Sequence, residues 1–385
     1  MKQSLLLTNA KVVLPDRVVS RVDVLLDDGL IAALDPDSSG CARRVDLDGR
    51  LLMPGMIDLH CDALEKEVEP RPDVHFPLNF ACAQADKRNA AAGITTVYHA
   101  IAFAHQELGV RNIAFAADLA RAVHAWQVHA LVENRVHARY EVTDPEGPEV
   151  IQGLVQEGIL HLLSFMDHTP GQGQYKDAAS YRQFLARTYK RTEQELDEIL
   201  ARKTADVAAI AGRVGKLAAL AKAKGIPLAS HDDDSPERMA ALAGLGVSIS
   251  EFPIDLATAK AARSLGIATL VGAPNLLRGA SMSGALLALD AVREGVADCL
   301  CGDYSPAALL PSVLKLAELG ECGLADAVAL VTRNPARAVG LSDRGEIRVG
   351  RRADLIAVRQ FGDLPQVERV WVGGKATYRA HFDKV

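Results

Sequence analysis

Hydrophobic and polar positions alternate at both ends of the chain with the two-residue period that is typical of strands. The first fifty residues contain SLLLTNAKVVL and RVDVLLDDGLIAALD, and the Asp28–Gly29 pair inside the second run predicts a hairpin. ADLIAVRQ and QVERVWVGGKATYRA have the same texture near the other end. Because neither end is long enough for a good core of its own, both are predicted to form one small β-sandwich domain from residues 1–51 plus 345–385.

The middle of the chain, residues 52–344, alternates short apolar runs with stretches of helical period such as VAAIAGRVGKLAALAKAK and MSGALLALDAVREGV. This α/β alternation predicts a (β/α)8 barrel of the TIM type. A doubly wound open sheet is the alternative, which the absence of G-x-G-x-x-G after the first strand disfavours. The eight predicted strands are 52–62, 94–101, 134–142, 159–168, 226–232, 247–253, 267–274 and 297–304.

One polar, basic and aromatic segment, at about 171–203, interrupts this rhythm and predicts a helical insert. It is either a solvated helix pair on the rim of the barrel or a lid over an anionic substrate. The basic side chains that such a lid would carry are Lys176, Arg182, Arg187 and Lys190.

Composition narrows the function classes. Apolar residues make up 49% of the chain, which excludes an intrinsically disordered protein. The 43 Lys and Arg against 49 Asp and Glu give a net charge of −6, which argues against nucleic-acid binding because that needs a basic surface. A small molecule that carries phosphate stays compatible, since a local basic pocket does not appear in a net charge.

The sequence also favours the cytoplasm. The apolar stretch near the amino terminus is too short for the core of a signal peptide, and no run of about 18 uncharged apolar residues could cross a membrane. The six cysteines include no C-x-x-C pair and are too few to cross-link 385 residues, so they are expected to be reduced thiols.

Metal-ligand side chains gather where the predicted strands end, which in a barrel is the catalytic face. A lone histidine or aspartate is weak evidence for a metal site, and the three aspartates after His231 could form a capped turn. The occurrence of such side chains at the ends of several strands together predicts a metal centre. Imidazoles together with carboxylates suit Zn, with Mn or Fe as alternatives. Two adjacent ions need a bridging anion, for which Glu141 is best placed. The predicted ligands are His60, Asp62, Glu141, His168, His231 and Asp303.

Three segments resemble the amidohydrolase superfamily: PGMIDLH at 54–60, GITT at 93–96, and the run from TRNPARAVGL to RADL at 332–355. The resemblance implies a metal-dependent (β/α)8 barrel beside a β-sandwich made from both chain ends. The chain departs from the superfamily pattern because His-x-His is replaced by His60-Cys61-Asp62. No lysine is an obvious candidate for carbamylation, and Glu141 looks like its replacement.

LHCDALEKEVEPRP, FMDHTPGQGQ, LASHDD, EFP, GAPNLLRGASMSG and GDYSPAALL are together similar to one family of this superfamily. That family is the diphosphatases that act on α-D-ribose 1-methylphosphonate 5-triphosphate and release pyrophosphate in phosphonate catabolism. The resemblance implies two divalent ions and Asp303 as the catalytic group that accepts the proton of water. The implied substrate-binding residues are Lys66, Arg71, Arg139, Lys176, Asn275, Arg278, Ser281 and Ser283.

Two rival functions stay open at this point. The first is the commoner chemistry of the superfamily, in which a cyclic amide is opened or a base deaminated. The second is a scaffold on the same fold, which is not expected to keep ligand-type side chains at every strand end. Metal identity and the role of Glu251 are also left open, and a homo-oligomer, by default a dimer, is expected.

Overall fold

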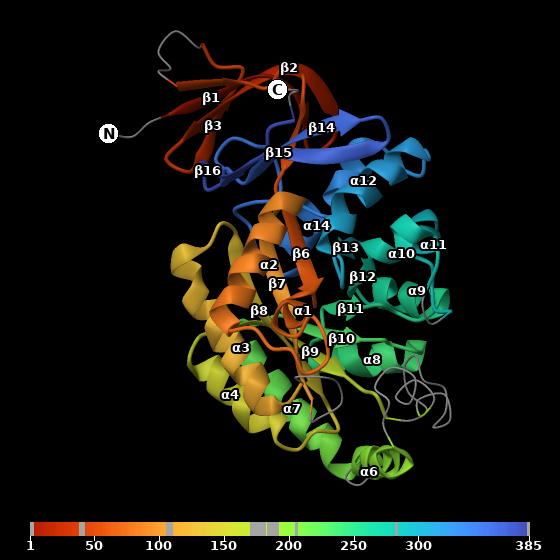
Figure 1. Ribbon diagram of the computed structural model, residues 1–385. Helices are drawn as coiled ribbons and strands as arrows, with labels where there is room; N and C mark the ends of the chain where they lie inside the picture. The colour runs from red at the N-terminus through yellow and green to blue at the C-terminus, as the bar shows by residue number, and fades with distance from the viewer. Residues whose placement is uncertain are drawn as a thin grey trace.

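The structure is a computed structural model that describes residues 4–37, 43–104, 111–169, 182, 192–204, 207–281 and 284–382. It contains two eight-stranded sheets that lie one above the other in Figure 1. The upper sheet, which we call the terminal sheet, brings the two ends of the chain together. Its strands are β1 (Leu5–Val13), β2 (Val18–Asp27), β3 (Leu30–Leu34), β4 (Arg43–Asp46), β5 (Leu51–Pro54), β14 (Leu355–Phe361), β15 (Leu364–Val372) and β16 (Lys375–Arg379).

The terminal sheet is mostly antiparallel and runs in the order β16-β15-β14-β5-β1-β2-β3, with β4 parallel to β1. The predicted hairpin is confirmed: β2 and β3 pair across Asp28 and Gly29. Both turn residues have positive φ, 50° and 82°, as a two-residue hairpin turn of the primed type requires. The sheet is therefore assembled from the two sequence ends, as predicted, whereas the domain limits at 51 and 345 stay predictions.

The second sheet is the predicted barrel. Its eight parallel strands follow one another in sequence order, and an isolated parallel bridge joins Cys61 of β6 to Asp303, two residues past β13. The predicted (β/α)8 architecture is therefore confirmed. The barrel strands are β6 (Met56–Cys61), β7 (Ile94–Phe103), β8 (Glu133–Glu141), β9 (Leu160–Met166), β10 (Leu228–His231), β11 (Ile249–Glu251), β12 (Ala268–Gly272) and β13 (Cys299–Cys301).

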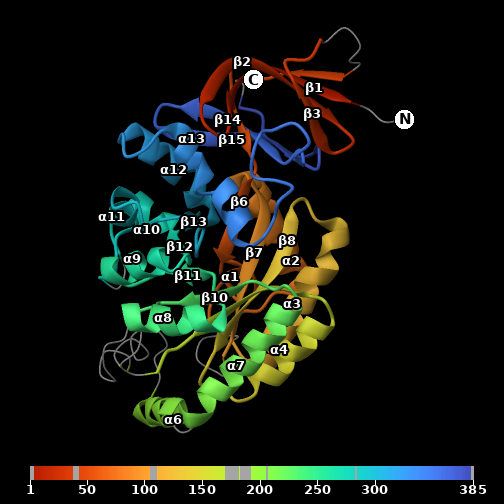
Figure 2. The same cartoon turned by 180° about the vertical axis from the view of Figure 1, so that it is seen from behind.

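Helices surround the barrel strands in both views (Figures 1 and 2). They are α1 (Leu64–Val68), α2 (Leu78–Ala92), α3 (Ile113–Trp126), α4 (Gly147–Gln156), α6 (Glu193–Thr204), α7 (Val207–Ala223), α8 (Pro236–Leu245), α9 (Leu256–Ser264), α10 (Ala273–Arg278), α11 (Ala288–Arg293), α12 (Leu309–Glu318), α13 (Leu324–Ala329) and α14 (Arg333–Ala338). Short 3-10 turns occupy Gln127–His129 and Pro306–Ala308.

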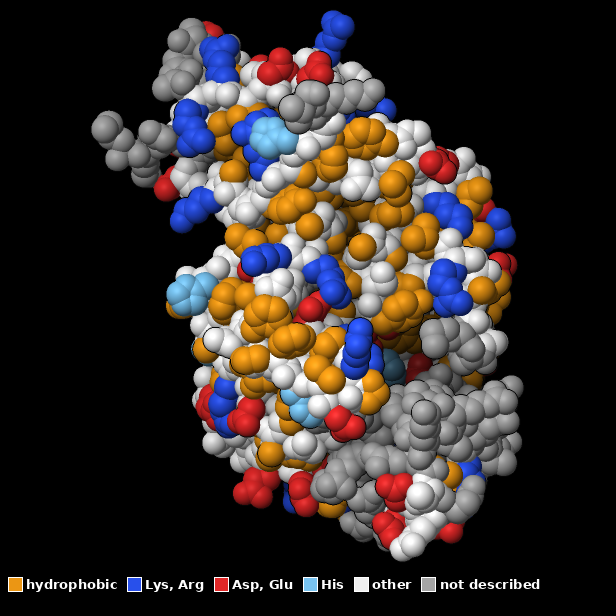
Figure 3. Space-filling model, viewed as in Figure 1, with side chains coloured by type: hydrophobic (Ala, Val, Ile, Leu, Met, Phe, Trp, Pro, Cys, Tyr) orange, Lys and Arg blue, Asp and Glu red, His pale blue; other side chains and the backbone are white. Residues whose placement is uncertain are grey.

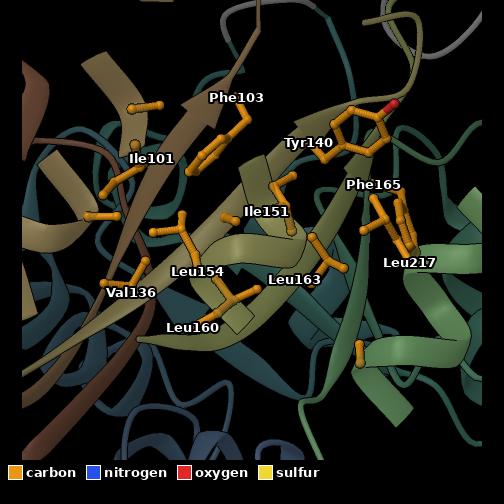
Figure 4. Close-up of a cluster of buried hydrophobic side chains, with 14 of the residues drawn as sticks. Ile101, Phe103, Val136, Tyr140, Ile151, Leu154, Leu160, Leu163, Phe165 and Leu217 are labelled. Carbon is orange, nitrogen blue, oxygen red and sulfur yellow. The ribbon is translucent and has the colours of Figure 1, made fainter. Parts of the chain in front are cut away.

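The helices pack on the outward faces of the strands through apolar side chains. Figure 4 shows one such cluster, in which Phe103 of β7, Tyr140 of β8 and Phe165 of β9 face Ile151 and Leu217 from α4 and α7. Burial of large apolar side chains contributes about 1.5–3 kcal/mol for each one, so this layer fixes the helices against the strands.

Two predicted elements differ from the structure. The single strand predicted over 52–62 is wrong: Pro54 ends β5 in the terminal sheet, and β6 begins at Met56 in the barrel. Gly55 between them passes so close to Thr95 that a Cβ atom would lie 2.2 Å from its hydroxyl oxygen. Of the helix predicted from MSGALLALDAVREGV, the described residues form only α11, because Asn275 bonds the backbone of Leu286 and Ala288 and holds the residues just before α11 extended.

The carboxyl end of β6 points away from the terminal sheet, toward the end of the molecule that carries α6 and α8 (Figure 1). Acidic side chains gather at this lower end of the surface (Figure 3), where α6 contributes Glu195, Asp197 and Glu198. Helix α6 belongs to the predicted insert, and its Asp197 pairs with Arg182 at 2.6 Å. Lys176, Arg187 and Lys190 lie outside the described residues. Among the described helices, none is both long and apolar enough to cross a membrane.

Candidate metal and phosphate site

A cavity of about 320 Å³ opens where the barrel strands end. It brings together eight of the predicted site residues, which come from the ends of five different strands or from the segments that follow them. These eight are His60, Asp62, Arg139, His231, Asn275, Arg278, Ser281 and Asp303. Asp232, Phe252, Gly272 and Tyr304 also line it. The strand ends therefore converge as the barrel predicted.

A buried carboxylate, Glu251 at the end of β11, lies beneath this cavity among three histidines. Its Oε1 atom lies 3.0 Å from His60 Nδ1 and 3.6 Å from His137 Nε2. Its Oε2 atom lies 3.3 Å from His231 Nδ1 and accepts a hydrogen bond of 2.7 Å from Ser164. Glu251, whose role the sequence left open, thus lies directly behind two predicted ligands, His60 and His231.

The charges of this cluster follow from burial and contact. Burial alone would raise the pKa of the Glu251 carboxyl, but the neighbouring imidazoles hold that pKa well below its usual range. Burial lowers the pKa of His137 to about 3 and also lowers the pKa of His231. Because an ionised Glu251 only accepts hydrogen bonds, His60 and His231 donate to it from Nδ1, which leaves Nε2 of each ring as the atom that could bind a metal ion.

Arg139 of β8 lies beside two predicted ligands. Its Nη1 atom lies 3.4 Å from His60 Nε2 and 3.5 Å from Asp62 Oδ2, and its Nε atom contacts the sulfur of Met166. A guanidinium group only donates hydrogen bonds. Arg139 therefore faces the same lone pair of His60 and the same carboxylate of Asp62 that a metal cation would bind. The pairing of His60 with Asp62 across one cation stays a prediction; both side chains lie beside Arg139.

Glu141 and His168 are not among the described residues that line the cavity; they form an adjoining cluster. His168 Nδ1 lies 2.8 Å from Glu141 Oε2, and Thr143 donates to Glu141 Oε1 at 2.8 Å. Lys203 of α6, itself 4% exposed, reaches the same carboxylate at 3.3 Å. Burial would raise the pKa of Glu141, but Lys203 and then His168 lower it below its usual range.

Asp303 is held at the mouth of the barrel by the backbone of the first strand. Its N–H donates to His60 O at 2.8 Å, and its carbonyl accepts from Asp62 N at 3.1 Å. The preceding residue, Gly302, donates to Asp58 Oδ1 at 2.9 Å, and a Cβ atom on Gly302 would lie 2.3 Å from Asp58 Oδ2. Glycine is therefore required at 302, and this close approach sets the position of Asp303.

Electrostatics near Asp303 follow from crowding of carboxylates in a buried place. Burial, and then the charge of Asp62, raise the pKa of Asp303 to about 6. Burial likewise raises the pKa of Asp58 to about 6. The hydrogen bonds that its Oδ1 accepts from the backbone N–H groups of Gly302 and His60 lower this pKa but do not offset burial. Cations in the cavity would offset this concentration of negative charge.

The predicted phosphate-binding residues divide into three groups. Arg278 lines the cavity and donates to the hydroxyl of Tyr304 at 3.3 Å, next to Ser281. Lys66 and Arg71 are exposed, and neither is among the described residues that line the cavity. Lys176 and Ser283 lie outside the described residues.

The donor set fits a transition-metal site. Among the described residues, one group of ligand atoms from His60, His231 and Glu251 lies within 4.8 Å of one another. Protein zinc sites combine imidazole with carboxylate, and the ligating ring usually donates its second N–H to a carboxylate, as His60, His168 and His231 each do here.

Sequence reasoning missed several side chains of this site: His137, Ser164, Asp232 and Lys203 as neighbours of the ligands, Asp58 as the anchor of Gly302, and Tyr304 at the mouth. Asp58 and Tyr304 stand inside the segments PGMIDLH and GDYSP, so a signal existed for both. Lys203 had none, since one lysine in a polar helix is ordinarily solvated.

Comparison with known proteins places this fold and site in a family. A model described as the amidohydrolase family matches residues 51–377, and the chain belongs to this family of metal-dependent hydrolases. Over 97% of its length it is 34% identical to the alpha-D-ribose 1-methylphosphonate 5-triphosphate diphosphatase of Escherichia coli (strain K12), all of which it covers. Both resemblances predicted from the sequence are thereby confirmed.

Other relatives are more distant. A dihydroorotase of Methanopyrus kandleri is 36% identical over 88 residues, which are 18% of this chain and 21% of that protein. Among solved structures, the N-acetylglucosamine-6-phosphate deacetylase of Pasteurella multocida has a TM-score of 0.67 at 13% identity, covering 97% of this chain and 99% of its own. At that identity the likeness concerns the fold alone.

Proposed function

We propose that this hydrolase acts on α-D-ribose 1-methylphosphonate 5-triphosphate and releases pyrophosphate, leaving the 5-phosphate. The observation that carries the proposal is the 34% identity, over 97% of the chain, to the Escherichia coli protein named for that activity. The matched length includes the segments that form the cavity.

The charges of the cavity support an anionic substrate. A triphosphate needs cations around it. Two guanidinium groups line the cavity: that of Arg139 from β8 and that of Arg278 from the end of α10. Ser281 adds a hydroxyl donor. A neutral ring substrate would gain nothing from two guanidinium groups in this place, whereas phosphate oxygens accept from guanidinium in pairs.

We further propose that the site takes two divalent ions, with zinc as the first candidate and Mn or Fe as alternatives. His60, Asp62 and Asp303 would hold one ion, and His168 and His231 would contribute to the other. Such ions lower the pKa of bound water and draw charge from phosphoryl oxygens. Side chains of the protein would accept the proton of water and bind the phosphoryl groups.

Asp303 is the proposed acceptor of the proton of the attacking water. Its backbone is tied on both sides to the first strand, which fixes its carboxylate at the mouth of the cavity rather than leaving it on a mobile loop. Arg278, steadied by Tyr304, would hold the leaving pyrophosphate, and Arg139 would face the phosphoryl group nearest to His60. The positive charge stabilises the negative charge that grows on the leaving group.

The test is pyrophosphate release by purified, metal-reconstituted protein. Three substrates are offered: the ribose 5-triphosphate phosphonate, ATP, and dihydroorotate or a hydantoin. Selective release from the ribose compound, strongly reduced in Asp303→Asn, is the expected result. Turnover of the cyclic amide alone would mean that the dihydroorotase-like segment, rather than the full-length likeness, reports the substrate.

Silence on all three substrates by a metal-loaded protein would overturn the substrate while leaving a metal-dependent hydrolase in place. Asp303→Asn is expected to reduce kcat by ~10²–10⁴, the usual contribution of a general base. A non-catalytic scaffold would not respond to the same substitution. A wild type that is inactive and also binds no metal would overturn the proposal that the protein is an enzyme.

A further inference from the structure

The three consecutive aspartates after β10 have three different environments. Asp233 is fully buried and accepts hydrogen bonds from the hydroxyls of Ser230 and Ser250. Asp234 is partly exposed at the turn that leads into α8. Asp232 is only 9% exposed, and its Oδ2 atom, also buried, accepts no hydrogen bond from any described residue.

A buried carboxylate oxygen without a partner is costly, by several kcal/mol if it stays charged and unpaired. Asp232 is held in this position by its backbone, which has a φ of 53° and donates from N to Glu251 O at 2.9 Å. The left-handed conformation turns the side chain toward the cavity, which it lines together with His231. The arrangement therefore calls for a positively charged partner that enters from the cavity.

Two imidazoles face this oxygen. Asp232 Oδ2 lies 3.7 Å from His231 Nε2 and 4.0 Å from His168 Nε2. The Nδ1 atom of His231 bonds to Glu251 and that of His168 bonds to Glu141, so each ring in its neutral form has its lone pair on Nε2. Both nitrogens that face Asp232 are thus of the kind that binds metals.

The distances suit a metal ion more than a direct contact. Zinc binds imidazole nitrogen and carboxylate oxygen at about 2.0–2.2 Å, so two ligand atoms on one ion lie at most ~4.2 Å apart. The separations of Asp232 Oδ2 from the two imidazoles, 3.7 Å and 4.0 Å, are too long for hydrogen bonds, and each falls within that limit for one carboxylate–imidazole pair. Among the described residues, the three ligand atoms that all lie within 4.8 Å of one another are those of His60, His231 and Glu251, so His168 completes the proposed set through its contact with Asp232. Two imidazoles and one carboxylate are the ligand set of many Zn and Fe sites.

We propose that Asp232 is a metal ligand, which with His168 and His231 holds one divalent cation of the zinc type. In the same arrangement Glu141 is a positioning residue that accepts from His168, rather than the bridging ligand expected from the sequence. Lys203 neutralises Glu141 from α6 and thereby removes it as a competing anion. The inference rests on the proposed metal-dependent hydrolysis but does not depend on the identity of the substrate.

The test measures metal binding rather than turnover. Chelator-treated wild type, Asp232→Asn and the neighbouring control Asp234→Asn are reconstituted with Zn²⁺, freed of excess ion, and analysed for metal per chain. A competitive chelator then gives the affinity of the weaker ion. We expect Asp234→Asn to match the wild type, and Asp232→Asn to lose one ion per chain or to bind it at least ~10-fold more weakly.

Cobalt supplies a second readout, because its visible absorption reports the ligands of the ion. Asp232→Asn is expected to change the spectrum of one of the two Co²⁺ ions and to spare the other. Should that variant fail to fold, Asp232→Ala decides, since it removes the same carboxylate and should lose the same equivalent of metal. His168→Asn removes another ligand of the same ion, so its combination with Asp232→Asn should lose no more metal than either single variant.

The outcomes separate the two proposals. Unchanged metal content, affinity and cobalt spectrum in Asp232→Asn would overturn the role of Asp232, whatever the enzyme hydrolyses. A wild type that holds its ions but ignores the triphosphate would overturn the substrate and leave the Asp232 result standing. A wild type that binds no divalent ion would overturn both.

Discussion

The Oε1 atom of Glu251 lies 3.0 Å from Nδ1 of His60, and both side chains are withdrawn from solvent at the centre of the barrel. The sixth strand therefore orients a proposed ligand on the first strand, although the two residues are 191 positions apart in the sequence. The second oxygen of the same carboxylate faces His231 on the fifth strand. One buried anion thus fixes the ring of two proposed ligands that belong to different ions.

Glu251→Gln is expected to lower metal affinity by ~10–100-fold, the usual effect of removing the carboxylate behind a ligating histidine. The amide presents an N–H to a ring that must itself donate, so one of the two bonds is lost. Metal titration with a competing chelator measures the change. Glu346→Gln removes another buried carboxylate, placed among Arg337, Arg348 and Arg351, and should leave metal affinity unchanged. Equal loss in both variants would contradict a specific role for Glu251.

Arg278→Ala is expected to raise KM for the triphosphate by ~10–100-fold, since a hydrogen bond to a charged group contributes about 1.5–3 kcal/mol. The guanidinium lines the cavity and is already steadied by Tyr304. Lys66→Ala is the matched control. Lys66, like Arg278, was predicted to bind phosphate, but it is exposed and is not among the described residues that line the cavity. Steady-state kinetics decide; a larger effect at Lys66 than at Arg278 would reverse their order of importance.

Asp58→Ala should destabilise the protein by roughly 2–4 kcal/mol and reduce kcat. It leaves the buried N–H groups of Gly302 and His60 without their acceptor, at a cost of about 1–3 kcal/mol each. Asp58→Asn keeps an oxygen in the same place and should retain most of the stability. Urea unfolding gives the free energy of each variant. If alanine were tolerated as well as asparagine, Asp58 would not be the anchor of the Asp303 loop.

Glu133, at the start of β8, joins the barrel to the segment that leads back to the terminal sheet. Its carboxylate pairs with Arg344 and Arg352, and Arg344 also donates to Thr96 at 3.0 Å. Burial would raise the pKa of Glu133, but Arg344 and then Arg135 lower it to about 2. The carboxyl is thus ionised in the folded protein under conditions where it is protonated in the unfolded chain.

Because the folded pKa of Glu133 is depressed, its contribution to stability is complete above about pH 4.3 and is lost as the pH falls toward 2. Glu133→Gln should therefore reduce the unfolding free energy at neutral pH by on the order of 2–3 kcal/mol and flatten its fall in acid. Urea unfolding across pH 2–7 measures both effects. Parallel pH profiles for the variant and the wild type would refute the assignment. Glu157→Gln, which breaks an exposed pair with Arg121, should change the profile far less.

The sequence by itself determined the architecture. Two-residue alternation at the ends and helical periods in the middle record which faces are buried, and burial is a local property of each strand or helix. It also determined the ligand types at the strand ends, since parallel strands of a barrel must deliver His60, His231 and Asp303 to one face. The break at Gly55 was missed because it depends on the proximity of Thr95, forty residues away.

Tertiary structure alone decided how the side chains divide the work. Nothing along the chain distinguishes Asp232 from Asp233, yet two serines satisfy one carboxylate while the other faces two imidazoles. Nor does spacing reveal that Glu251 stands behind His60 or that Lys203 reaches Glu141 from α6. Hydrogen-bond partners and charge depend on distances of a few ångströms between segments far apart in sequence, and only the folded barrel sets those distances.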